Sequence, residues 1–320
     1  MKVLVISLSN LGDAILTYPA LAALWKGYPD AEFHVLASPR TLELFNGEPR
    51  FQKVWLWRKK APFWRQASLI AQLALERFHL VVDFRNSLIP LFLIGARRAP
   101  ILRHSSNSIT HRATHHLNVV KSLGISGNEG PAPLPFDAED ERILNLLLGP
   151  ANKLQPGQRI VVMAPGSRSH LKRWPGRRFS AVADQLIKQF HVRVILLGGT
   201  DDIPESRAVR AAMRHPSADL TGQTTIRQTA ALLSRAELLI TNDSACLHAA
   251  EMMGVPAVAI FGPTDEKKYG PRHPRSIVVR RRLVCAPCEK ALCPYHHECL
   301  QQLDAAEVFS AASKILSVVQ

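Results

Sequence analysis

The sequence has no apolar run close to the roughly 20 residues that a membrane-spanning helix requires. Its start, Met1–Ile6, reads as a strand and lacks the basic region, longer apolar stretch and small-residue cleavage site of a signal peptide. We therefore expect a cytoplasmic protein without a transmembrane helix. The chain is also poor in acidic residues, with 26 Asp and Glu against 40 Lys and Arg and a net charge of +14. This surplus favours an anionic partner, although a solvated surface without a dedicated partner is the alternative.

The glycine patterns of common nucleotide-binding loops are missing as well. The loop after the first apolar run, Leu8–Asp13, has one glycine where a dinucleotide-binding fold has G-x-G-x-x-G, which disfavours NAD at this position. Cysteine is sparse, with five residues, of which Cys246 stands alone. The other four are clustered: Cys285, Cys288, Cys293 and Cys299. Their spacing does not match a zinc ribbon, so the prediction is a reduced or partly oxidised loop, with a tetrahedral structural metal site as the alternative.

What the sequence does contain is a regular alternation of β-branched runs and amphipathic helical patterns. The expected strands are 3–7, 32–37, 54–57 and 80–84 in the first half and 160–164, 193–197, 238–241 and 257–261 in the second. The expected helices are 64–78, 138–148, 179–190, 226–235, 244–253 and 304–319. Such alternation predicts an α/β fold of doubly wound parallel sheets with helices on both faces.

A stretch rich in proline and glycine, residues 127–158, interrupts this series and is typical of a linker. We therefore expect two Rossmann-like domains, 1–150 and 151–302, that face each other across a cleft. The remaining residues, 303–320, contain a helix that could pack back on the first domain.

The turn after the first strand contains a carboxylate, Asp13, that has either a structural or a catalytic role. Its candidate residues are Ser9, Asn10, Gly12 and Asp13. In open α/β sheets, ligands bind beyond the carboxyl ends of the strands. Asp13 is either the cap of a helix or a base that faces a ligand. Pro19 predicts that the helix kinks or begins near Thr17, and a late start would make Asp13 a loop carboxylate.

Three loops of the second half have the chemistry of an anion site. The loop after residue 164 carries hydroxyls and a lysine without being a P-loop, and a basic surface loop is the alternative. The stretch Thr241–His248 begins a helix that Asp243 or Ser244 would cap, and the N–H groups at its start suit an anion. The candidate residues of these loops are Ser167, Ser169, Lys172, Asp243, Ser244, Ala245, His248 and Thr264.

Together, four motifs resemble glycosyltransferase family 9, the ADP-heptose:lipopolysaccharide heptosyltransferases. The motifs are Leu11-Gly12-Asp13 with Pro19, Lys172-x-Trp174-Pro175, Thr241-Asn242-Asp243-Ser244 with His248, and Phe261-Gly262-Pro263-Thr264. The cysteine cluster further resembles the branch that adds the second heptose of the inner core. The resemblance implies a GT-B fold, in which the first domain binds the acceptor and the second binds the donor. It also implies inverting, metal-independent transfer of L-glycero-D-manno-heptose from ADP-heptose, a co-substrate, with no cofactor.

The resemblance implies a role for each candidate residue. Asp13 would be the general base that deprotonates the acceptor hydroxyl, and Lys172 would stabilise the charge on the leaving ADP. Asp243 would lie near the heptose and the pyrophosphate. Ser244 and Ala245 stand where the family usually has Thr and Gly, so the hydroxyl is kept and the backbone approach is slightly more crowded. The remaining donor-binding residues would be Ser167, Ser169, His248 and Thr264.

The resemblance also accounts for the basic surplus. The acceptor would be a phosphorylated, lipid-anchored lipopolysaccharide core, and the protein would associate peripherally with the acidic cytoplasmic face of the inner membrane. One alternative is another GT-B enzyme that uses a different nucleotide sugar. Another is a nucleic-acid-binding protein, which we do not expect, because its basic residues should form one strip with stacking aromatics. The basic residues instead fall in separate clusters: Arg58-Lys59-Lys60 with Arg65, Arg97-Arg98 with Arg103, and Arg280-Arg281-Arg282.

Overall fold

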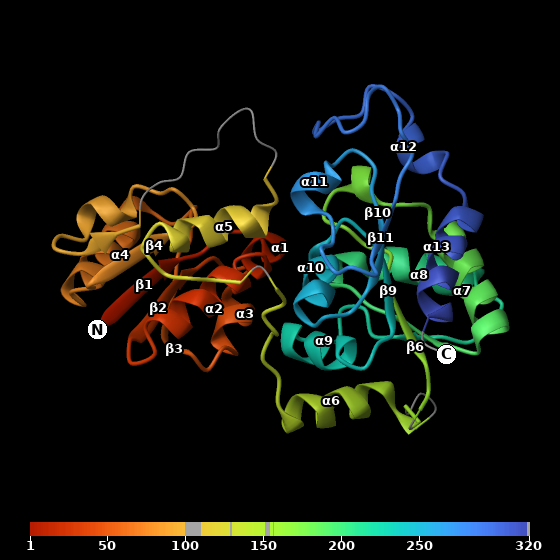
Figure 1. Cartoon of the computed structure of the whole chain (residues 1–320), viewed down its shortest axis with the longest axis horizontal. Coiled ribbons are helices and arrows are strands. Elements are labelled where there is room, and N and C mark those ends of the chain that lie inside the picture. The colour runs from red at the N-terminus through yellow and green to blue at the C-terminus, as the bar shows by residue number, and fades with distance from the viewer. Residues whose placement is uncertain (100–109, 129, 151–153, 156, 319–320) are drawn as a thin grey trace. The chain divides into compact units, whose positions relative to one another are not determined.

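The structure, a computed structural model, describes residues 1–99, 110–128, 130–150, 154–155 and 157–318. The chain divides into two compact units, Met1–Pro135 and Phe136–Gln320. Each unit is a parallel sheet with helices packed around it (Figure 1), which confirms the predicted α/β fold with two Rossmann-like sheets. Three predicted features, Arg103, Val319 and the domain start at residue 151, lie outside the described residues.

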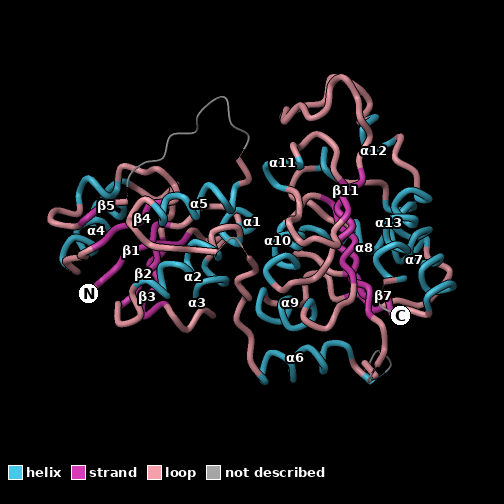
Figure 2. The backbone as a smooth tube through the Cα atoms, in the orientation of Figure 1, coloured by secondary structure: helices cyan, strands magenta, loops and turns pink. Residues whose placement is uncertain are grey.

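The sheet of the first unit has the strand order β3-β2-β1-β4-β5, and its described neighbours pair in parallel. The strands are β1 Lys2–Ile6, β2 Glu32–Ala37, β3 Phe51–Leu56, β4 Leu80–Asp83 and β5 Arg97–Arg98. The helices are α1 Leu11–Ile15, α2 Tyr18–Gly27, α3 Leu42–Asn46, α4 Phe63–Leu75, the 3-10 turn η1 Ile89–Phe92 and α5 Arg112–Lys121. Figure 2 shows these elements as separate helix and strand segments. The central strands β1 and β4 are almost wholly apolar, as burial on both faces of a parallel sheet requires.

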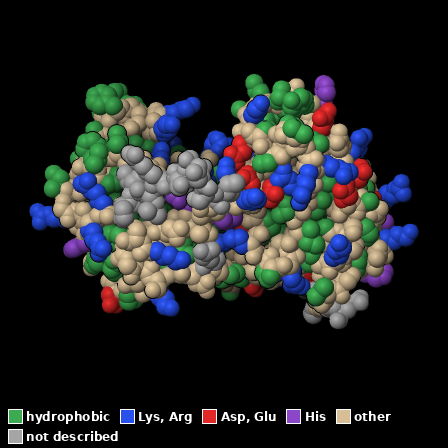
Figure 3. Space-filling model, turned by 45° about the horizontal axis from the view of Figure 1, so that its top comes forward, with side chains coloured by type: hydrophobic (Ala, Val, Ile, Leu, Met, Phe, Trp, Pro, Cys, Tyr) green, Lys and Arg blue, Asp and Glu red, His purple; other side chains and the backbone are tan. Residues whose placement is uncertain are grey.

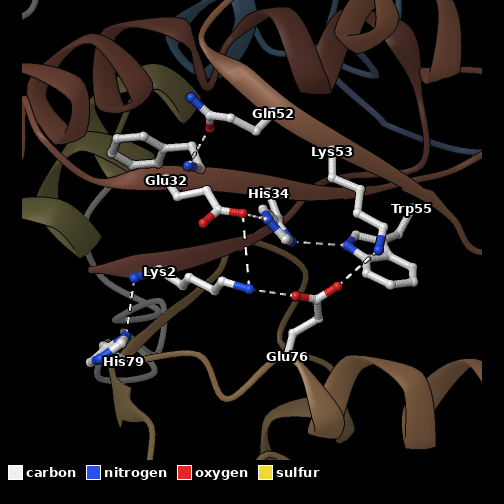
Figure 4. A network of polar contacts seen from close by, with 9 residues as sticks. Lys2, Glu32, His34, Gln52, Lys53, Trp55, Glu76 and His79 are labelled. Carbon is white, nitrogen blue, oxygen red and sulfur yellow. Dashed lines mark hydrogen bonds and ion pairs between the residues drawn. The ribbon is translucent and has the colours of Figure 1, made fainter.

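A polar network links the first three strands and begins at the amino ends of β1 and β2 (Figure 4). Glu76 accepts from Lys2 at 2.7 Å and from Lys53 at 2.8 Å. The buried His34 accepts at Nδ1 from the indole N–H of Trp55 at 3.2 Å. Because an indole nitrogen only donates, Nε2 of His34 carries the proton and donates to Glu32 at 2.7 Å. The network thus joins β1, β2 and β3 and reaches Trp55 near the carboxyl end of β3.

The sheet of the second unit has the strand order β11-β10-β9-β6-β7-β8, again parallel throughout. The strands are β6 Ile160–Ala164, β7 Arg193–Leu196, β8 Ala218–Asp219, β9 Leu238–Asn242, β10 Ala257–Ile260 and β11 Ile277–Val279. The helices are α6 Ala138–Leu148, α7 Gly176–Phe190, α8 Ile203–Ala212, α9 Ile226–Leu233, α10 Ala245–Met252, α11 Glu266–Tyr269, α12 Glu298–Gln301 and α13 Ala305–Ser317, with 3-10 turns η3 His170–Lys172 and η4 Thr200–Asp202. Within the described ranges, no helix has both the length and the apolar character to cross a bilayer.

Helix α6 belongs to the second unit, so the unit boundary lies earlier in the chain than the expected residue 150. The side chain of Asp137 caps α6 by accepting from the N–H groups of its first turn. Arg227 of α9 then pairs with both Asp137 and Asp140, at 2.6 Å each. These ion pairs hold α6 against α9, which the proline and glycine pattern did not indicate.

The last helix, α13, also packs within the second unit. Its residues Val308, Ala312 and Leu316 are buried in the same core cluster as Trp174 and Phe179. The indole N–H of Trp174 donates to the carbonyl of Leu303 at 2.9 Å, just before the helix. The sequence left open a return of this helix to the first domain; its apolar face is instead part of the core of the second unit.

Candidate functional site

Each sheet has one topological switch point, where the chain leaves the first strand on one side and later returns on the other. In the first unit this point lies between β1 and β4, and in the second it lies between β6 and β9. Ligands of open α/β sheets bind at such points, beyond the carboxyl ends of the strands. The two loops with the most distinctive motifs, after β1 and after β6, both begin there.

Asp13 lies in the first turn of the short helix α1, and a second helix, α2, begins at Tyr18. Asn10 is the N-cap residue of α1, and its side-chain amide donates to Oδ2 of Asp13 at 3.0 Å. The sequence offered two interpretations of Asp13, a helix cap or a base that faces a ligand. The cap is wrong, because Asn10 is the N-cap residue and Asp13 lies inside the helix, so Asp13 is not a loop carboxylate either. The base stays a prediction. Pro19, in the first turn of α2, separates the two helices, as the predicted kink requires. Asp13 is partly exposed and held by one amide, so its other oxygen is available to a ligand.

The neighbouring strand contributes an acid that the sequence analysis missed. Asp83 ends β4 and lies opposite Ile6 of β1, at the same switch point as the loop with Asp13. Its carboxylate accepts from the N–H groups of Arg85 and Ser87 and from the Ser87 hydroxyl, at 2.7–2.8 Å. Burial raises its pKa despite these bonds. In the sequence, this residue could have been noticed only as an Asp at the end of an apolar strand. Its hydrogen bonds to Arg85 and Ser87 show that it stabilises the turn after β4.

In the second unit, the structure brings together two of the predicted donor-binding loops. The ammonium of Lys172, after β6, lies 2.6 Å from Oδ2 of Asp243, after β9. The Ser167 hydroxyl donates to the carbonyl of Asp243 at 2.9 Å. Asp243 and Ser167 are buried, whereas Lys172 is partly exposed. The lysine is therefore positioned by a buried carboxylate while it keeps access to the surface.

Asn242 holds the same two loops together and was not singled out from the sequence. It is fully buried at the end of β9. Its amide N–H donates to the carbonyl of Pro165 at 2.7 Å, and its amide oxygen accepts from the N–H of Trp174 at 3.1 Å. One side chain thus fixes both ends of the loop that carries Ser167 and Lys172. A polar residue at the end of an otherwise apolar strand was the signal for this role.

Helix α10 begins at this point, and its N-terminus is not capped as predicted. Ser244 is the N-cap residue, but its hydroxyl bonds to Oγ1 of Thr241 at 3.1 Å and makes no side-chain cap. Ala245 is the first helical residue and is partly exposed. The next residue, Cys246, has its pKa raised to about 12 by burial and by the nearby Asp202. It remains a thiol at neutral pH, which excludes a thiolate nucleophile here.

Two further predicted residues lie close to these loops in the chain. His248 is buried one turn into α10. Thr264 is 5% exposed on the loop after β10, the strand next to β9, and its hydroxyl has no hydrogen-bond partner among the described residues. A buried hydroxyl without a partner is costly, so Thr264 is a candidate for a ligand contact. Ser169 precedes η3 and is half-buried, with no side-chain cap.

A fourth loop completes the site and was also missed. Asp202, in the loop after β7, packs directly under Gly166: a Cβ at Gly166 would lie 2.0 Å from the carboxyl carbon of Asp202. Burial raises the pKa of Asp202. A side chain at position 166 would overlap Asp202, which explains the glycine at this point of the loop after β6.

The clustered cysteines line one small cavity beside these loops. Leu171 and Pro263 form part of its wall, together with Cys285, Cys288, Cys293 and Cys299. The carbonyl of Pro263 accepts from the N–H groups of Cys288 and Glu289, which anchors the cysteine loop. Burial and the other three thiols raise the pKa of Cys299. All five cysteines are free thiols, and no set of three or more His, Cys, Asp or Glu in the described part of the chain is arranged to hold a metal.

The arrangement was compared with known proteins. The family model described as glycosyltransferase family 9 (heptosyltransferase) matches residues 138–298, half of the chain. The chain belongs to glycosyltransferase family 9. It is therefore a glycosyltransferase, as the motifs indicated.

Relatives of this glycosyltransferase extend over its whole length. It is 26% identical to the lipooligosaccharide heptosyltransferase 2 of Campylobacter jejuni, over 98% of this chain and 99% of that protein. It is 27% identical to a lipopolysaccharide heptosyltransferase 3 of Escherichia coli, over 81% of this chain and 83% of that protein. The solved E. coli ADP-heptose lipopolysaccharide heptosyltransferase II has the same fold, with a TM-score of 0.80 at 20% identity, over 99% of each chain.

These comparisons bear differently on the two halves of the glycosyltransferase. The residues matched by the family model include Lys172, Asp243 and the loops around them, but not Asp13. The first unit lies outside the match of the family model and is covered by the full-length relatives and by the solved structure. Heptosyltransferases numbered 2 and 3 match at nearly equal identity, so identity does not distinguish the two branches.

Proposed function

We propose that this glycosyltransferase transfers heptose from ADP-heptose to the inner core of lipopolysaccharide or lipooligosaccharide. The names of its relatives support this donor and this acceptor. The observation that carries the proposal is the Lys172–Asp243 pair at the switch point of the second sheet, beside the N-terminus of α10. A cation and oriented N–H groups at one point suit the diphosphate of a nucleotide sugar.

In the proposed reaction, the bond between the anomeric carbon and the β-phosphate oxygen breaks, and negative charge grows on ADP. Lys172 donates to a phosphate oxygen, and the first N–H groups of α10, at Ala245 and Cys246, point the positive end of the helix toward it. Asp243 orients the lysine and lies where it can accept from a sugar hydroxyl. The hydroxyls of Ser167, Ser169 and Thr264, and the imidazole of His248, contribute further donor contacts.

Asp13 acts on the acceptor in this proposal. The acceptor hydroxyl oxygen attacks the anomeric carbon as ADP leaves, and Asp13 takes the proton. The Asn10 amide holds one carboxylate oxygen and leaves the other for the hydroxyl. Ser9 and Gly12 supply the backbone of the turn around it. Direct displacement inverts the anomeric configuration, and the reaction requires Asp13 and Lys172 to act on the same heptosyl group.

The cysteine loop resembles the branch that adds the second heptose, so we propose an acceptor that already carries one heptose. The test is a transfer assay with ADP-heptose and core acceptors that carry none, one or two heptoses, read by mass spectrometry and by NMR of the new linkage. We expect addition to the one-heptose acceptor with inverted anomeric configuration. Retained configuration would contradict the single displacement, and transfer from UDP-sugars but not from ADP-heptose would contradict the donor.

A further inference from the structure

Helix α4 of the first unit presents an apolar outer face. Trp64, Ala71 and Leu75 fall on one line of the helix at i, i+7 and i+11, opposite the buried Leu73. Trp64 is 60% exposed, Leu75 81% and the adjacent Phe63 78%. The rings of Phe63 and Trp64 contact each other edge to face, with centroids 5.5 Å apart. A helix on the surface of a soluble domain normally turns charged residues outward, so this face is unusual.

The segment around η1, which packs on the inner side of α4, exposes further apolar side chains. Residues Leu73, Ile89 and Leu93 are buried in one core cluster and join α4 to η1. From the same segment, four apolar side chains point outward and are at least half exposed: Leu88, Leu91, Phe92 and Ile94. We refer to Phe63, Trp64, Leu75 and these four residues as the apolar face. Single exposed apolar residues are common, but seven within 32 residues of chain are a sign of an interaction surface.

The segment of chain that carries the apolar face is strongly basic. Residues 49–128 contain thirteen Lys and Arg but only two acidic residues, Glu76 and Asp83, so they supply +11 of the net charge of +14. Glu76 is bonded to Lys2 and Lys53, and Asp83 accepts hydrogen bonds from its own turn. Figure 3 shows blue and green side chains with little red on the face of this unit that is in view. Two of the three basic clusters of the sequence thus fall in this one segment, which holds thirteen of the forty Lys and Arg.

Basic residues directly border the aromatic end of the face. Arg58, Lys59 and Lys60 are exposed on the turn before α4. The side-chain amide of Gln66 donates to the carbonyls of Lys59 and Ala61, at 3.1 and 2.8 Å, and holds this turn against the helix. The turn that carries these three cations is therefore held against the end of the helix that carries Phe63 and Trp64.

We propose that the apolar face and its basic border form a docking surface for an anionic phospholipid bilayer. Aromatic and aliphatic side chains would enter the interface, and Lys59, Lys60 and their neighbours would contact lipid phosphates. Leucine and isoleucine cannot stack on bases, which disfavours a nucleic acid. A second copy of this chain would place two positive surfaces against each other, which disfavours self-association. The proposal does not depend on the transfer chemistry.

Tryptophan fluorescence tests the proposal directly, because the other four tryptophans, Trp25, Trp55, Trp57 and Trp174, are buried or half-buried. The full chain is mixed with vesicles of phosphatidylcholine and phosphatidylglycerol and with vesicles of phosphatidylcholine alone. We expect co-sedimentation and a blue shift of emission with the anionic vesicles, both weakened by salt. In Trp64→Phe the shift should disappear while co-sedimentation is kept.

Two variants separate the apolar and the ionic contributions. Trp64→Ser should weaken vesicle binding by about tenfold, and Lys59→Glu/Lys60→Glu should weaken it by at least about fivefold for each charge. The matched controls are in the second unit: Leu146→Ser, an exposed apolar residue of α6, and Arg207→Glu/Arg210→Glu on α8. Both controls should bind as the unchanged protein does, and circular dichroism verifies that every variant is folded.

Four results would overturn the proposal. They are no co-sedimentation with anionic vesicles, no blue shift on binding, equal loss in the second-unit controls, and tight binding of an oligonucleotide that vesicles do not compete away. Concentration-dependent dimerisation that Trp64→Ser abolishes would assign the face to a second copy instead. Because none of these measurements uses ADP-heptose, loss of the proposed activity and loss of the docking surface remain distinguishable.

Discussion

The ammonium of Lys172 lies 2.6 Å from Oδ2 of Asp243 and so joins the loop after β6 to the loop after β9. Both loops leave the sheet at its switch point. The Asn242 side chain joins them through hydrogen bonds to the backbones of Pro165 and Trp174. The pair therefore combines a buried, fixed carboxylate with a cation that reaches the surface. This is the arrangement on which the proposed binding of the donor diphosphate depends.

Lys172→Ala should weaken ADP binding. A charge-assisted hydrogen bond to phosphate contributes about 1.5–3 kcal/mol, so the dissociation constant should rise about ten- to hundredfold. Isothermal titration calorimetry measures this directly, with Lys188→Ala on the exposed side of α7 as the control. An unchanged affinity in Lys172→Ala would remove the lysine from the donor site.

Gly166→Ala should damage the same site by a steric route. The new Cβ would overlap the carboxyl group of Asp202, whereas in Gly199→Ala the Cβ would lie 3.8 Å from that carboxylate, an ordinary contact. We expect a lower melting temperature and weaker ADP binding for Gly166→Ala, and near-normal values for Gly199→Ala. The double variant Gly166→Ala/Asp202→Gly should regain stability relative to Gly166→Ala, because it removes the carboxyl group and also the Asp202 Cβ, which would lie 2.5 Å from the new Cβ. Equal behaviour of the two single variants would contradict the close approach.

The strands of both sheets could be predicted because burial on two faces leaves an apolar, β-branched signal. Predicted strands 32–37 and 160–164 coincide with β2 and β6, and the others differ by a few residues at their ends. The strands β5, β8 and β11 were not predicted, because each is an edge strand of only two or three residues. In addition, β5 and β8 contain charged side chains. Their pairing depends on the neighbouring strand rather than on their own composition.

In the site, the sequence identified the residues with reactive groups but not the ones that hold them. Lys172, Ser167 and Asp243 were predicted and do lie together. Asn242 and Asp202 were missed, because their roles depend on contacts with loops far away in the chain. The predicted cap at α10 failed for a similar reason: the Thr241 hydroxyl competes for Ser244.

The polar network that joins β1, β2 and β3 should give a pH-dependent stability. Hydrogen bonds from Lys2 and Lys53 lower the pKa of Glu76 from its ordinary 4.5 to about 2. A lowered pKa means that the ionised form stabilises the fold above pH 4.5 and that this contribution disappears as the pH falls toward 2. Urea unfolding should show Glu76→Gln less stable than the unchanged protein near neutral pH, with the difference shrinking below pH 4.5. Asp30→Asn, an exposed carboxylate, is the control; a difference that grows in acid would contradict the assignment.

Chelation should leave transfer unaffected. In the proposed reaction Lys172 and the start of α10 stabilise the leaving ADP, so no metal ion is needed for that charge. We expect the same kcat before and after dialysis against EDTA, measured with ADP-heptose and the one-heptose acceptor. Activity that is lost on chelation and restored by one divalent metal would contradict this part of the mechanism and would direct attention to Cys285, Cys288, Cys293 and Cys299.

The role of Asp13 is the central claim, and the Asp13→Asn variant tests it most directly. The change keeps the size of the side chain but removes its ability to take a proton, so kcat should fall about 10²–10⁴-fold. ADP affinity should stay unchanged by calorimetry, because the donor contacts lie in the second unit. A variant that keeps a tenth of the original kcat would contradict the assignment of Asp13 as the base.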